Sequence, residues 1–519
     1  MNQIKISVVT PIFKPNLEQL EDCLASVNVN GMVEHLLGID GPDALEDPIS
    51  FQQLAEKYSA IVTQTPGHGG ISAATNAAAG LASGSLLLFL DQDDFLVGDW
   101  QKEVFPFADT KDIVYSDRHT AAEDGALIAD QIFRKPDWSP IRLLGNMYIS
   151  HFFAIRRDLF AQLGGMRSDF DGSQDHDLAL RALETNPEVK HIALPLYAWR
   201  QSQNSTALNP AAKSYAVDAG IAAVNEHHKR SNNSLNTVRH DIYPGFYVHK
   251  YPKRELPVSI VVPTAFGSNV DGFPIIRNLI ESLVLELNHQ DDEVVIVSAG
   301  EADQGEMERI TNRLNCRLVH LVDNEPFNFS RRVNLGAIQA TNETILFLND
   351  DVEFISKNPL DALMYTSQRE KVGAVGAHLL FPDGSLQHAG HAYYKLGAHH
   401  PYYLTKDFSQ HFGDLILDRE ISGVTAACLM MRKAIWKQVG GFTLHLPSNY
   451  NDVDFCLKIR EAGYSIALLN SVVANHYEST TRDPKLQDWE VKFIRHRWSH
   501  RLWFDRFTRA YEKFQDSDV

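Results

Sequence analysis

The stretch LLLFLDQDDF at residues 86–95 decides the fold, because it returns as TILFLNDDVEF at residues 344–354. In both copies a continuous apolar run ends directly in a cluster of acidic and amide side chains. Continuous apolar runs are typical of strands that are buried on both faces, as in a parallel sheet covered by helices. The stretch therefore predicts two α/β halves, each with polar side chains at the carboxyl end of a strand.

The repeat extends in both directions from this pair. Upstream, ISVVTPIF at residues 6–13 returns as VSIVVPTAF at residues 258–266. Downstream, each half has a Gly-Gly pair and then an acidic helix start, which reads SQDHD at residues 173–177 and YNDVD at residues 450–454. The order is kept and only the loop lengths differ, which indicates a duplicated fold.

The rhythm of apolar runs and helix-like stretches also predicts the domains. We expect a first domain at residues 1–230 and a second at 257–487, with 231–256 as a linker that has lost this rhythm. Residues 488–519 interleave aromatic and basic side chains. We expect a C-terminal helical tail that packs its aromatic residues on the second domain, and contact with a membrane surface is the alternative.

Composition excludes several classes of protein. The chain has 519 residues and a formal net charge of −18, so it lacks the basic field that holds nucleic acid. It contains no run of about 18–20 apolar residues that could span a membrane. The four cysteines are too sparse for a disulfide framework and have no zinc spacing. Because the start also shows no signal-peptide pattern, we expect a cytoplasmic protein.

The acids after the first apolar run are candidates for binding a cation. Asp91 and Asp93 stand at a strand end, where ligands gather in parallel sheets. Mg²⁺ is usually held by one or two carboxylates together with phosphate oxygens. One such cluster alone is more typical of a solvated turn or a helix cap. Its recurrence, with Asn349 and Asp351 in the second half, favours a functional site.

The acids at the helix starts suggest a second kind of chemistry. Asp175 and Asp452 could be simple caps stabilised by the helix dipole, but a carboxylate near a bound electrophile can also act as a general base. Each lies two residues before another acid, Asp177 or Asp454, so the two cannot share one helical face. We expect one acid of each pair to face a cleft while its neighbour caps the helix.

These ordered motifs resemble family 2 glycosyltransferases of the GT-A fold in both halves. In the first half the matching pieces are residues 8–13, residues 69–76, Asp91-Gln92-Asp93, Gln174-Asp175, and Trp199-Arg200 with Ser205. In the second half they are residues 261–264, residues 326–330 with Asn334, residues 348–351, residues 423–432 leading to Gly440-Gly441-Phe442, residues 451–454 and residues 476–479. The resemblance implies two tandem Rossmann-like domains with mostly parallel sheets. It also implies inverting transfer of a sugar from a nucleoside-diphosphate donor, with Mg²⁺ or Mn²⁺ as cofactor.

The resemblance assigns roles to individual residues. Asp175 and Asp452 would be the two bases. The metal would be held by Asp91, Asp93, Asp351 and His476. The donor would be bound by Pro11, Asp40, Asn76, Asp91, Arg200, Thr264, Asn334 and Asn349. The second half is similar in particular to the rhamnosyl- and galactofuranosyl-transferase branch, whose members build bacterial surface polysaccharides.

The sequence also departs from the family pattern. Asp40 matches the acid that reads the nucleobase, whereas the second half has Ser298 and no carboxylate there. Gln174 and Asn451 replace the first acid of a Glu-Asp pair. The first half has no counterpart of His476, and Arg200 is the candidate for binding the diphosphate in its place.

Several functions stay open at this point. We favour a bifunctional enzyme that adds sugars to a lipid-linked or oligosaccharide acceptor of the O-antigen or capsule type. In one alternative only one domain is catalytic and the other binds the acceptor; in another the chain is a scaffold without turnover. A dinucleotide oxidoreductase is disfavoured because residues 67–70 do not form the glycine fingerprint. Association with the inner face of a membrane, a homo-oligomer and an assembly complex are open interpretations.

Overall fold

A computed structural model describes residues 4–201, 210–243, 245–268, 272–300, 304–409, 413–477 and 486–508. Ser205, Glu478 and Ser479 of the family motifs, and the end of the expected tail from 509 onward, lie outside these residues. The chain divides into two compact units, Met1–Lys250 and Tyr251–Val519. The division falls within the segment 231–256, where we expected a linker.

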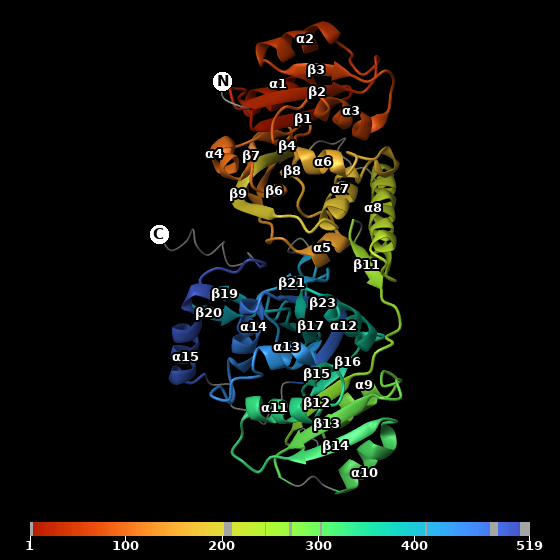
Figure 1. Ribbon diagram of the computed structural model, residues 1–519, viewed down its shortest axis with the longest axis vertical. Coiled ribbons are helices and arrows are strands. Elements are labelled where there is room, and N and C mark those ends of the chain that lie inside the picture. The colour runs from red at the N-terminus through yellow and green to blue at the C-terminus, as the bar shows by residue number, and fades with distance from the viewer. Residues whose placement is uncertain are drawn as a thin grey trace. The chain divides into compact units, whose positions relative to one another are not determined.

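The first unit is an α/β domain (Figure 1). Its strands are β1 (Ile6–Ile12), β2 (Val33–Ile39), β3 (Ile61–Gln64), β4 (Leu86–Phe89), β5 (Phe95–Leu96), β6 (Ile113–Ala121), β7 (Leu127–Phe133), β8 (Phe153–Arg156), β9 (Val189–Arg200), β10 (Asn236–Arg239) and β11 (Tyr247–Lys250). Its helices are α1 (Leu17–Val27), α2 (Pro48–Lys57), α3 (Gly70–Ala79), α4 (Trp100–Val104), α5 (Pro140–Gly145), α6 (Arg157–Gln162), α7 (Gln174–Leu183) and α8 (Pro210–Arg230). The main sheet has the order β3-β2-β1-β4-β8-β6-β9-β5.

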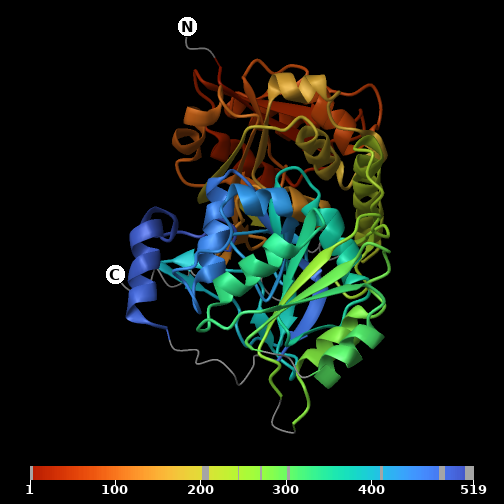
Figure 2. The same cartoon turned by 60° about the horizontal axis from the view of Figure 1, so that its bottom comes forward.

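The second unit repeats this plan (Figure 2). Its strands are β12 (Ser259–Thr264), β13 (Glu293–Ser298), β14 (Arg317–Val322), β15 (Thr344–Leu348), β16 (Val352–Phe354), β17 (Val372–Leu380), β18 (Leu386–His388), β19 (Ala392–Tyr394), β20 (Gly397–His399), β21 (Arg419–Ile421), β22 (Cys428–Arg432) and β23 (Ser465–His476). Its helices are α9 (Ile276–Leu283), α10 (Gln304–Arg313), α11 (Phe329–Gln339), α12 (Pro359–Ser367), α13 (Lys433–Gln438), α14 (Asn451–Glu461) and α15 (Asp488–Trp498). The main sheet has the order β14-β13-β12-β15-β22-β17-β23-β16.

The two sheet orders match strand for strand, as the sequence repeat predicted. The first four strands of each order are parallel, which places their carboxyl ends along one edge. β8 and β22 then run antiparallel to β4 and β15. This reversal brings the chain that enters β8 or β22 beside the acids that follow the central strand.

Both faces of the central strands are buried, which explains their continuous apolar sequence. In β4, Leu87 packs with Val9 in one hydrophobic cluster, whereas Leu86 and Leu88 pack with Val8 in another. Since successive side chains of a strand point to opposite faces, the two clusters lie on opposite sides of the sheet. A polar residue inside this run would be buried on either face.

Two segments complete the units. Within residues 231–256, β10 and β11 form an antiparallel hairpin, so this segment is not wholly an irregular linker. At the other end, α15 packs Ile494 and Trp498 into a cluster with Leu457 of α14, whereas Trp489 is 43% exposed. Among the described residues, no helix has both the length and the apolar character needed to cross a bilayer.

Candidate active sites

The first site begins where β4 ends. Asp91 and Asp93 are half-buried, and Asp91 lies close enough to Asp175 for their charges to interact. Removal from water, and second the charge of Asp175, raise the pKa of Asp91 to about 6. Removal from water and the charge of Asp91 likewise raise the pKa of Asp93. The structure thus brings the strand-end acids and the helix-start acid of the first domain together.

His151 joins this group, although the sequence motifs did not mark it. Its Nδ1 lies 3.7 Å from Oδ2 of Asp91, and its ring stacks on Tyr197 with centroids 5.2 Å apart. Desolvation lowers the pKa of His151 to about 4, so the ring is neutral near pH 7. One of its two nitrogens then has a lone pair available for a ligand. Asp91, Asp94 and His151 offer ligand atoms that all lie within 4.8 Å of one another.

Asp94 and Arg200 support the turn that carries the strand-end acids. Tyr197 donates its hydroxyl to Asp94 at 2.7 Å, and the main-chain N–H of Arg200 donates to the same carboxylate at 2.7 Å. The buried guanidinium of Arg200 donates to the carbonyls of Asp93 and Glu123 and pairs with Asp22. Binding of a diphosphate by Arg200 would require some of these contacts to be replaced.

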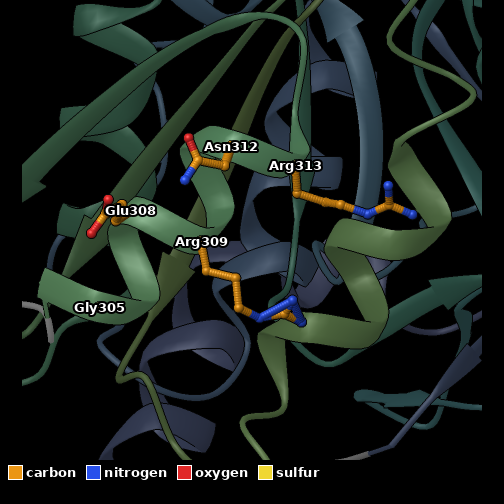
Figure 3. A pocket seen from close by; sticks show the side chains of 5 residues that line it. All are labelled: Gly305, Glu308, Arg309, Asn312 and Arg313. Carbon is orange, nitrogen blue, oxygen red and sulfur yellow. The ribbon is translucent and has the colours of Figure 1, made fainter.

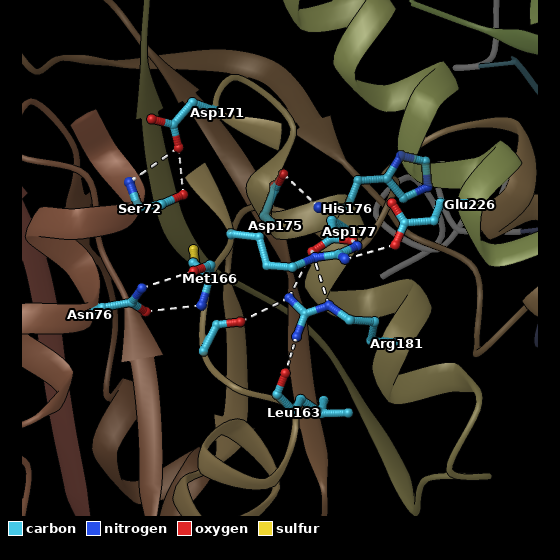
Figure 4. Close-up of polar contacts among 12 residues, drawn as sticks. Ser72, Asn76, Leu163, Met166, Asp171, Asp175, His176, Asp177, Arg181 and Glu226 are labelled. Carbon is cyan, nitrogen blue, oxygen red and sulfur yellow. Dashed lines mark hydrogen bonds and ion pairs between the residues drawn. The ribbon is translucent and has the colours of Figure 1, made fainter. Parts of the chain in front are cut away.

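The two acids at the start of α7 face different surroundings. Asp175 accepts a hydrogen bond from the hydroxyl of Ser150 at 2.6 Å on Oδ2 and one from the N–H of His176 at 2.8 Å on Oδ1. Asp177 is fully buried and forms ion pairs with Arg167 and Arg181 (Figure 4). The sequence predicted that one acid of this pair caps the helix. Asp177 instead forms ion pairs that hold the helix to the rest of the domain.

The second site uses a histidine from a different strand. Nε2 of His476, at the end of β23, lies 3.0 Å from Oδ1 of Asp351, and Nδ1 of the same ring lies 2.5 Å from Oε1 of Gln387. By strand pairing, His476 lies beside Val352. The equivalent strands of the first domain pair Phe95 with Ala198, and the last residues of β9, Trp199 and Arg200, include no histidine. Each domain thus brings an imidazole to its strand-end acids, from different parts of the fold.

The remaining strand-end residues of the second site are Asn349, Asp350 and Thr264. Oδ1 of Asn349 is buried and has no hydrogen-bond partner among the described residues. Thr264 donates its hydroxyl to Asp350 at 2.5 Å. Burial and the charge of Asp351 raise the pKa of Asp350 to about 7. Asp350 therefore supports the end of β12, and the contact of Asn349 and Asp351 with a ligand stays a prediction.

Two histidines, His391 and His388, lie between Asp452 and the strand-end residues of the second site. Its Oδ2 lies 3.9 Å from Nε2 of His391. The ring of His391 packs edge-on against His388 with centroids 5.1 Å apart, and His388 is close enough to His476 for their charges to interact. Asp454, like Asp177, is fully buried; it accepts hydrogen bonds from Thr443 and from the indole of Trp498.

Asn76 and Asn334 occupy equivalent positions with a structural task. The side chain of Asn76 donates to the carbonyl of Met166 at 2.8 Å and accepts from its N–H at 2.9 Å (Figure 4). Asn334 makes the same pair of bonds to Phe442. Each clasp ties a helix to the residue that follows a Gly-Gly pair. Their expected contact with the donor stays a prediction.

The first domain also has an exposed aromatic surface beside Asp40. Asp40 is buried, accepts hydrogen bonds from the N–H groups of Gly69 and Gly70, and lies 2.5 Å from Nδ1 of His68. The ring of His68 stacks on Phe13, with centroids 5.0 Å apart. Phe13 directly follows β1, the strand that contains Pro11. In the second domain Ser298 instead shares a hydrogen bond with His320.

A surface cavity of about 460 Å³ lies apart from these residues. It is lined by Gly305, Glu308, Arg309, Asn312 and Arg313 of α10 (Figure 3). Both of its arginines lie near carboxylates: Arg313 lies 2.6 Å from Glu281, and Arg309 lies 3.9 Å from Glu306. None of the acids described above lines it, so the cavity does not define the functional site.

The donor atoms of both sites fit a divalent cation. The first offers carboxylates and a neutral imidazole, and the second offers Asp351, His476 and the unpartnered amide oxygen of Asn349. In the second site Gln387 also holds the ring that would bind the ion, a common arrangement around metal-ligating histidines.

Comparisons with known proteins agree with the duplicated fold. Residues 7–164 match the model of "Glycosyl transferase family 2", and residues 256–499 match that of "Glycosyltransferase like family 2". Over 487 residues the chain is 34% identical to the O-antigen biosynthesis protein RfbC of Myxococcus xanthus, covering 92% of this chain and 38% of that protein. It is 33% identical over 496 residues to the uncharacterized protein y4gI of Sinorhizobium fredii, covering 92% and 53%. The chain thus spans about half or less of the length of these relatives.

Two solved structures show weaker similarity. S. aureus TarS 1-349 in complex with UDP is 19% identical, with a TM-score of 0.32 over 44% of this chain and 74% of that chain. GalNAc-T7 with UDP, GalNAc and Mn²⁺ is 11% identical, with a TM-score of 0.37 over 52% and 53%. Likenesses this weak carry no conclusion about ligands. From the two family matches, the chain belongs to glycosyltransferase family 2 and carries two domains of that family in tandem.

Proposed function

We propose that each domain is an inverting sugar-transfer site that takes its sugar from a nucleoside-diphosphate donor. One observation carries this proposal: both domains place strand-end ligands and a helix-start aspartate in one polar group. In the first domain Asp91 and Asp175 are close enough for their charges to interact. In the second, His476 lies 3.0 Å from Asp351 and close enough to His388 for their charges to interact. His388 packs against His391, which lies 3.9 Å from Asp452.

The donor would bind along the carboxyl edge of the parallel strands. Strand-end oxygens would hold a divalent cation, which neutralises charge on the departing diphosphate when it is bound. In the first domain, Phe13 and His68 present an exposed stacked surface beside Asp40, which suits a nucleobase. The second domain lacks that carboxylate, so its base recognition would rest on other groups.

The aspartates at the helix starts would do the proton chemistry. Asp175 and Asp452 would each take the proton of an acceptor hydroxyl as its oxygen attacks the anomeric carbon from the face opposite the diphosphate. One displacement of this kind inverts the anomeric configuration. Ser150 and the N–H of His176 fix the direction of the Asp175 carboxylate, as a positioned base requires.

The acceptor would be a growing bacterial surface polysaccharide of the O-antigen type, lipid-linked or as an oligosaccharide. Identity of 34% to a protein named for O-antigen biosynthesis supports this assignment. Because nucleotide sugars are cytoplasmic metabolites, the reaction would take place on the cytoplasmic side. In the alternative, one domain only binds the acceptor, and the absence of a carboxylate at Ser298 makes the second domain the candidate for that role.

Separate substitution of the two bases tests the proposal. The full chain would be assayed with Mn²⁺ and a panel of uridine and deoxythymidine diphosphate sugars, and each product linkage would be identified. We expect Asp175→Asn and Asp452→Asn each to abolish a different linkage, with losses of about 10²–10⁴-fold. If one substitution leaves all linkages intact, that domain is a binding module. If neither has an effect, the assignment of the bases is wrong.

A further inference from the structure

The second domain holds three neighbouring histidines that the family motifs leave without a role. The rings of His388, His391 and His400 have centroids 5.1 to 5.3 Å apart, and their interplanar angles are 68° to 81°. One ligand atom of each ring lies within 4.8 Å of the others. Three imidazoles in this arrangement could form a transition-metal site or a support for a neighbouring group.

The hydrogen bonds of His388 decide between these two uses. The main-chain N–H of Thr425 points at Nε2 of His388 from 3.0 Å, and this uses the one lone pair of the neutral ring. Nδ1 then carries the ring proton and donates it to Nδ1 of His400 at 3.0 Å. Burial and the neighbouring imidazoles hold the pKa of His388 well below its ordinary value, so the ring is neutral. His388 has no lone pair left for a metal, and the cluster is a support.

The supported group is the ring of His391. His391 is 2% exposed, and its main-chain N–H donates to the carbonyl of Gly423 at 2.7 Å. Gly423 leaves room for the ring, because a Cβ at that position would lie 3.0 Å from Nδ1 of His391. With His388 and His400 packed edge-on against it, the ring is held with Nε2 toward Asp452.

The proton of the His391 ring belongs on the nitrogen that faces Asp452. Burial lowers the pKa of His391, so the ring is neutral and carries one proton. Nε2 faces a carboxylate oxygen at 3.9 Å, whereas Nδ1 is buried without a hydrogen-bond partner among the described residues. A proton on Nδ1 would leave a buried donor unsatisfied and two acceptors facing each other. The geometry therefore favours an Nε2–H group directed at Oδ2 of Asp452.

The first domain has a counterpart of this contact. Oδ1 of Asp175 and Oδ1 of Asp452 each accept a hydrogen bond from the following main-chain N–H, at 2.8 Å in both cases. The two Oδ2 atoms are therefore equivalent. Oδ2 of Asp175 receives the hydroxyl of Ser150 at 2.6 Å, and Oδ2 of Asp452 faces His391.

We propose that His391 is a positioning residue of the second active site, which holds Oδ2 of Asp452 through its Nε2–H group during sugar transfer. The inference rests on the proposed role of Asp452 as the base. Hydrogen bonds between catalytic partners are often long in the free enzyme and shorten when substrate binds. In the transfer step the acceptor O–H gives its proton to Asp452, the acceptor oxygen bonds to the anomeric carbon, and the bond from that carbon to the diphosphate breaks. His391 keeps its own proton throughout.

Two substitutions separate this role from simple packing. His391→Phe fills the space and keeps the edge-on ring contacts but cannot donate, whereas His391→Gln can present an N–H near the position of Nε2. The full-length variants would be assayed with the nucleotide sugar that the donor panel identifies for the second domain. We expect His391→Phe to lower kcat of that transfer by about 10- to 100-fold with KM for the donor unchanged. We expect His391→Gln to restore most of it, and the linkage made by the first domain to be unaffected in both.

The outcomes are distinct. Full activity of His391→Phe, or equal losses in both variants, would overturn the inference, because neither result depends on an N–H group. Asp452→Asn, assayed alongside, separates the two proposals. If it retains second-domain transfer, the proposed base is wrong and the inference falls with it; if it is inactive while His391→Phe matches wild type, the inference alone fails. The first-domain variant Ser150→Ala is the mirror control and should lower only the other linkage.

Discussion

Nε2 of His476 lies 3.0 Å from Oδ1 of Asp351, while Nδ1 of the same ring faces the amide oxygen of Gln387. The Gln387 amide is oriented by its NH₂ group, which donates to the carbonyl of His476 at 3.4 Å. The ring proton therefore belongs on Nδ1, and the lone pair of Nε2 points at a carboxylate. Nε2 of His476 and Oδ1 of Asp351 are both acceptors at this distance. Their contact is favourable only if a positive charge, a proton or a metal ion, lies between or beside them.

We predict that Mn²⁺ binding in the second domain depends on Gln387 as well as on the ligands. Gln387→Leu removes the acceptor that fixes the ring of His476 and should weaken Mn²⁺ binding about 10- to 100-fold. His476→Ala should weaken it further. Calorimetric titration of the full chain would measure both, with Asp383→Asn, an exposed acid paired with Lys406, as the control. Equal Mn²⁺ affinity of all four proteins would contradict the metal assignment.

In the first domain, we predict that Mn²⁺ affinity depends on pH. The pKa of Asp91 is raised to about 6 by removal from water and by Asp175, so the metal must displace a proton at lower pH. Affinity should therefore fall by about tenfold per pH unit below pH 6 and level off above it. Because Asp175→Asn removes a charge that raises this pKa, it should move the fall to lower pH. A pH-independent affinity in protein with both Asp351→Asn and His476→Ala, which removes two ligands of the second site, would argue against Asp91 as a ligand.

The sequence alone predicts the sheets and the acidic motifs of this molecule, but not every residue of its candidate sites. The two sheets, the strand-end acids and the paired helix starts follow from apolar runs and a repeat, because both faces of the strands must be covered. His151 could not be found that way. It lies beside Asp91 only because β8 runs antiparallel to β4, and a short apolar run does not reveal its direction.

The aspartate pairs show a second limit of prediction from sequence. Their spacing indicated that Asp175 and Asp177 face different directions, and this is what the structure shows. Spacing could not indicate that Asp177 and Asp454 are buried in polar contacts, since their partners come from distant parts of the chain. Arg167 approaches Asp177, and Trp498 of α15 reaches Asp454.

The hydrogen bonds of Asn76 and Asn334 predict a measurable contribution to the stability of each domain. Asn76→Ala removes two hydrogen bonds and leaves the main-chain groups of Met166 without partners. We expect the free energy of unfolding of that domain to fall by about 1–3 kcal/mol in urea titrations. Asn334→Ala should do the same in the second domain. The family resemblance also predicts that Asn76 and Asn334 contact the donor, so the UDP affinity of the folded variants should fall as well. UDP affinity equal to wild type would limit these asparagines to the structural task.

The C-terminal helix should matter for one domain only. Trp498→Phe keeps most of the packing in its cluster but removes the indole N–H that Asp454 accepts at 2.8 Å. Because Asp454 and Asp452 lie in the same first turn of α14, the variant should lower second-domain transfer and leave the other linkage unchanged. Product analysis would measure both linkages in one reaction. The exposed Trp489→Phe is the matched control, and an equal effect of the two variants would contradict this reading.

The most direct test of two complete sites in one chain is a crystal structure of the full protein with Mn²⁺ and UDP, with data collected to locate manganese by anomalous scattering. We expect two manganese peaks per chain, one in contact with the Asp91 group and one bound by Asp351 and His476. A single peak would show that one domain does not bind the metal, and so would contradict a metal-assisted transfer site in that domain. Peaks away from both groups would contradict the central claim.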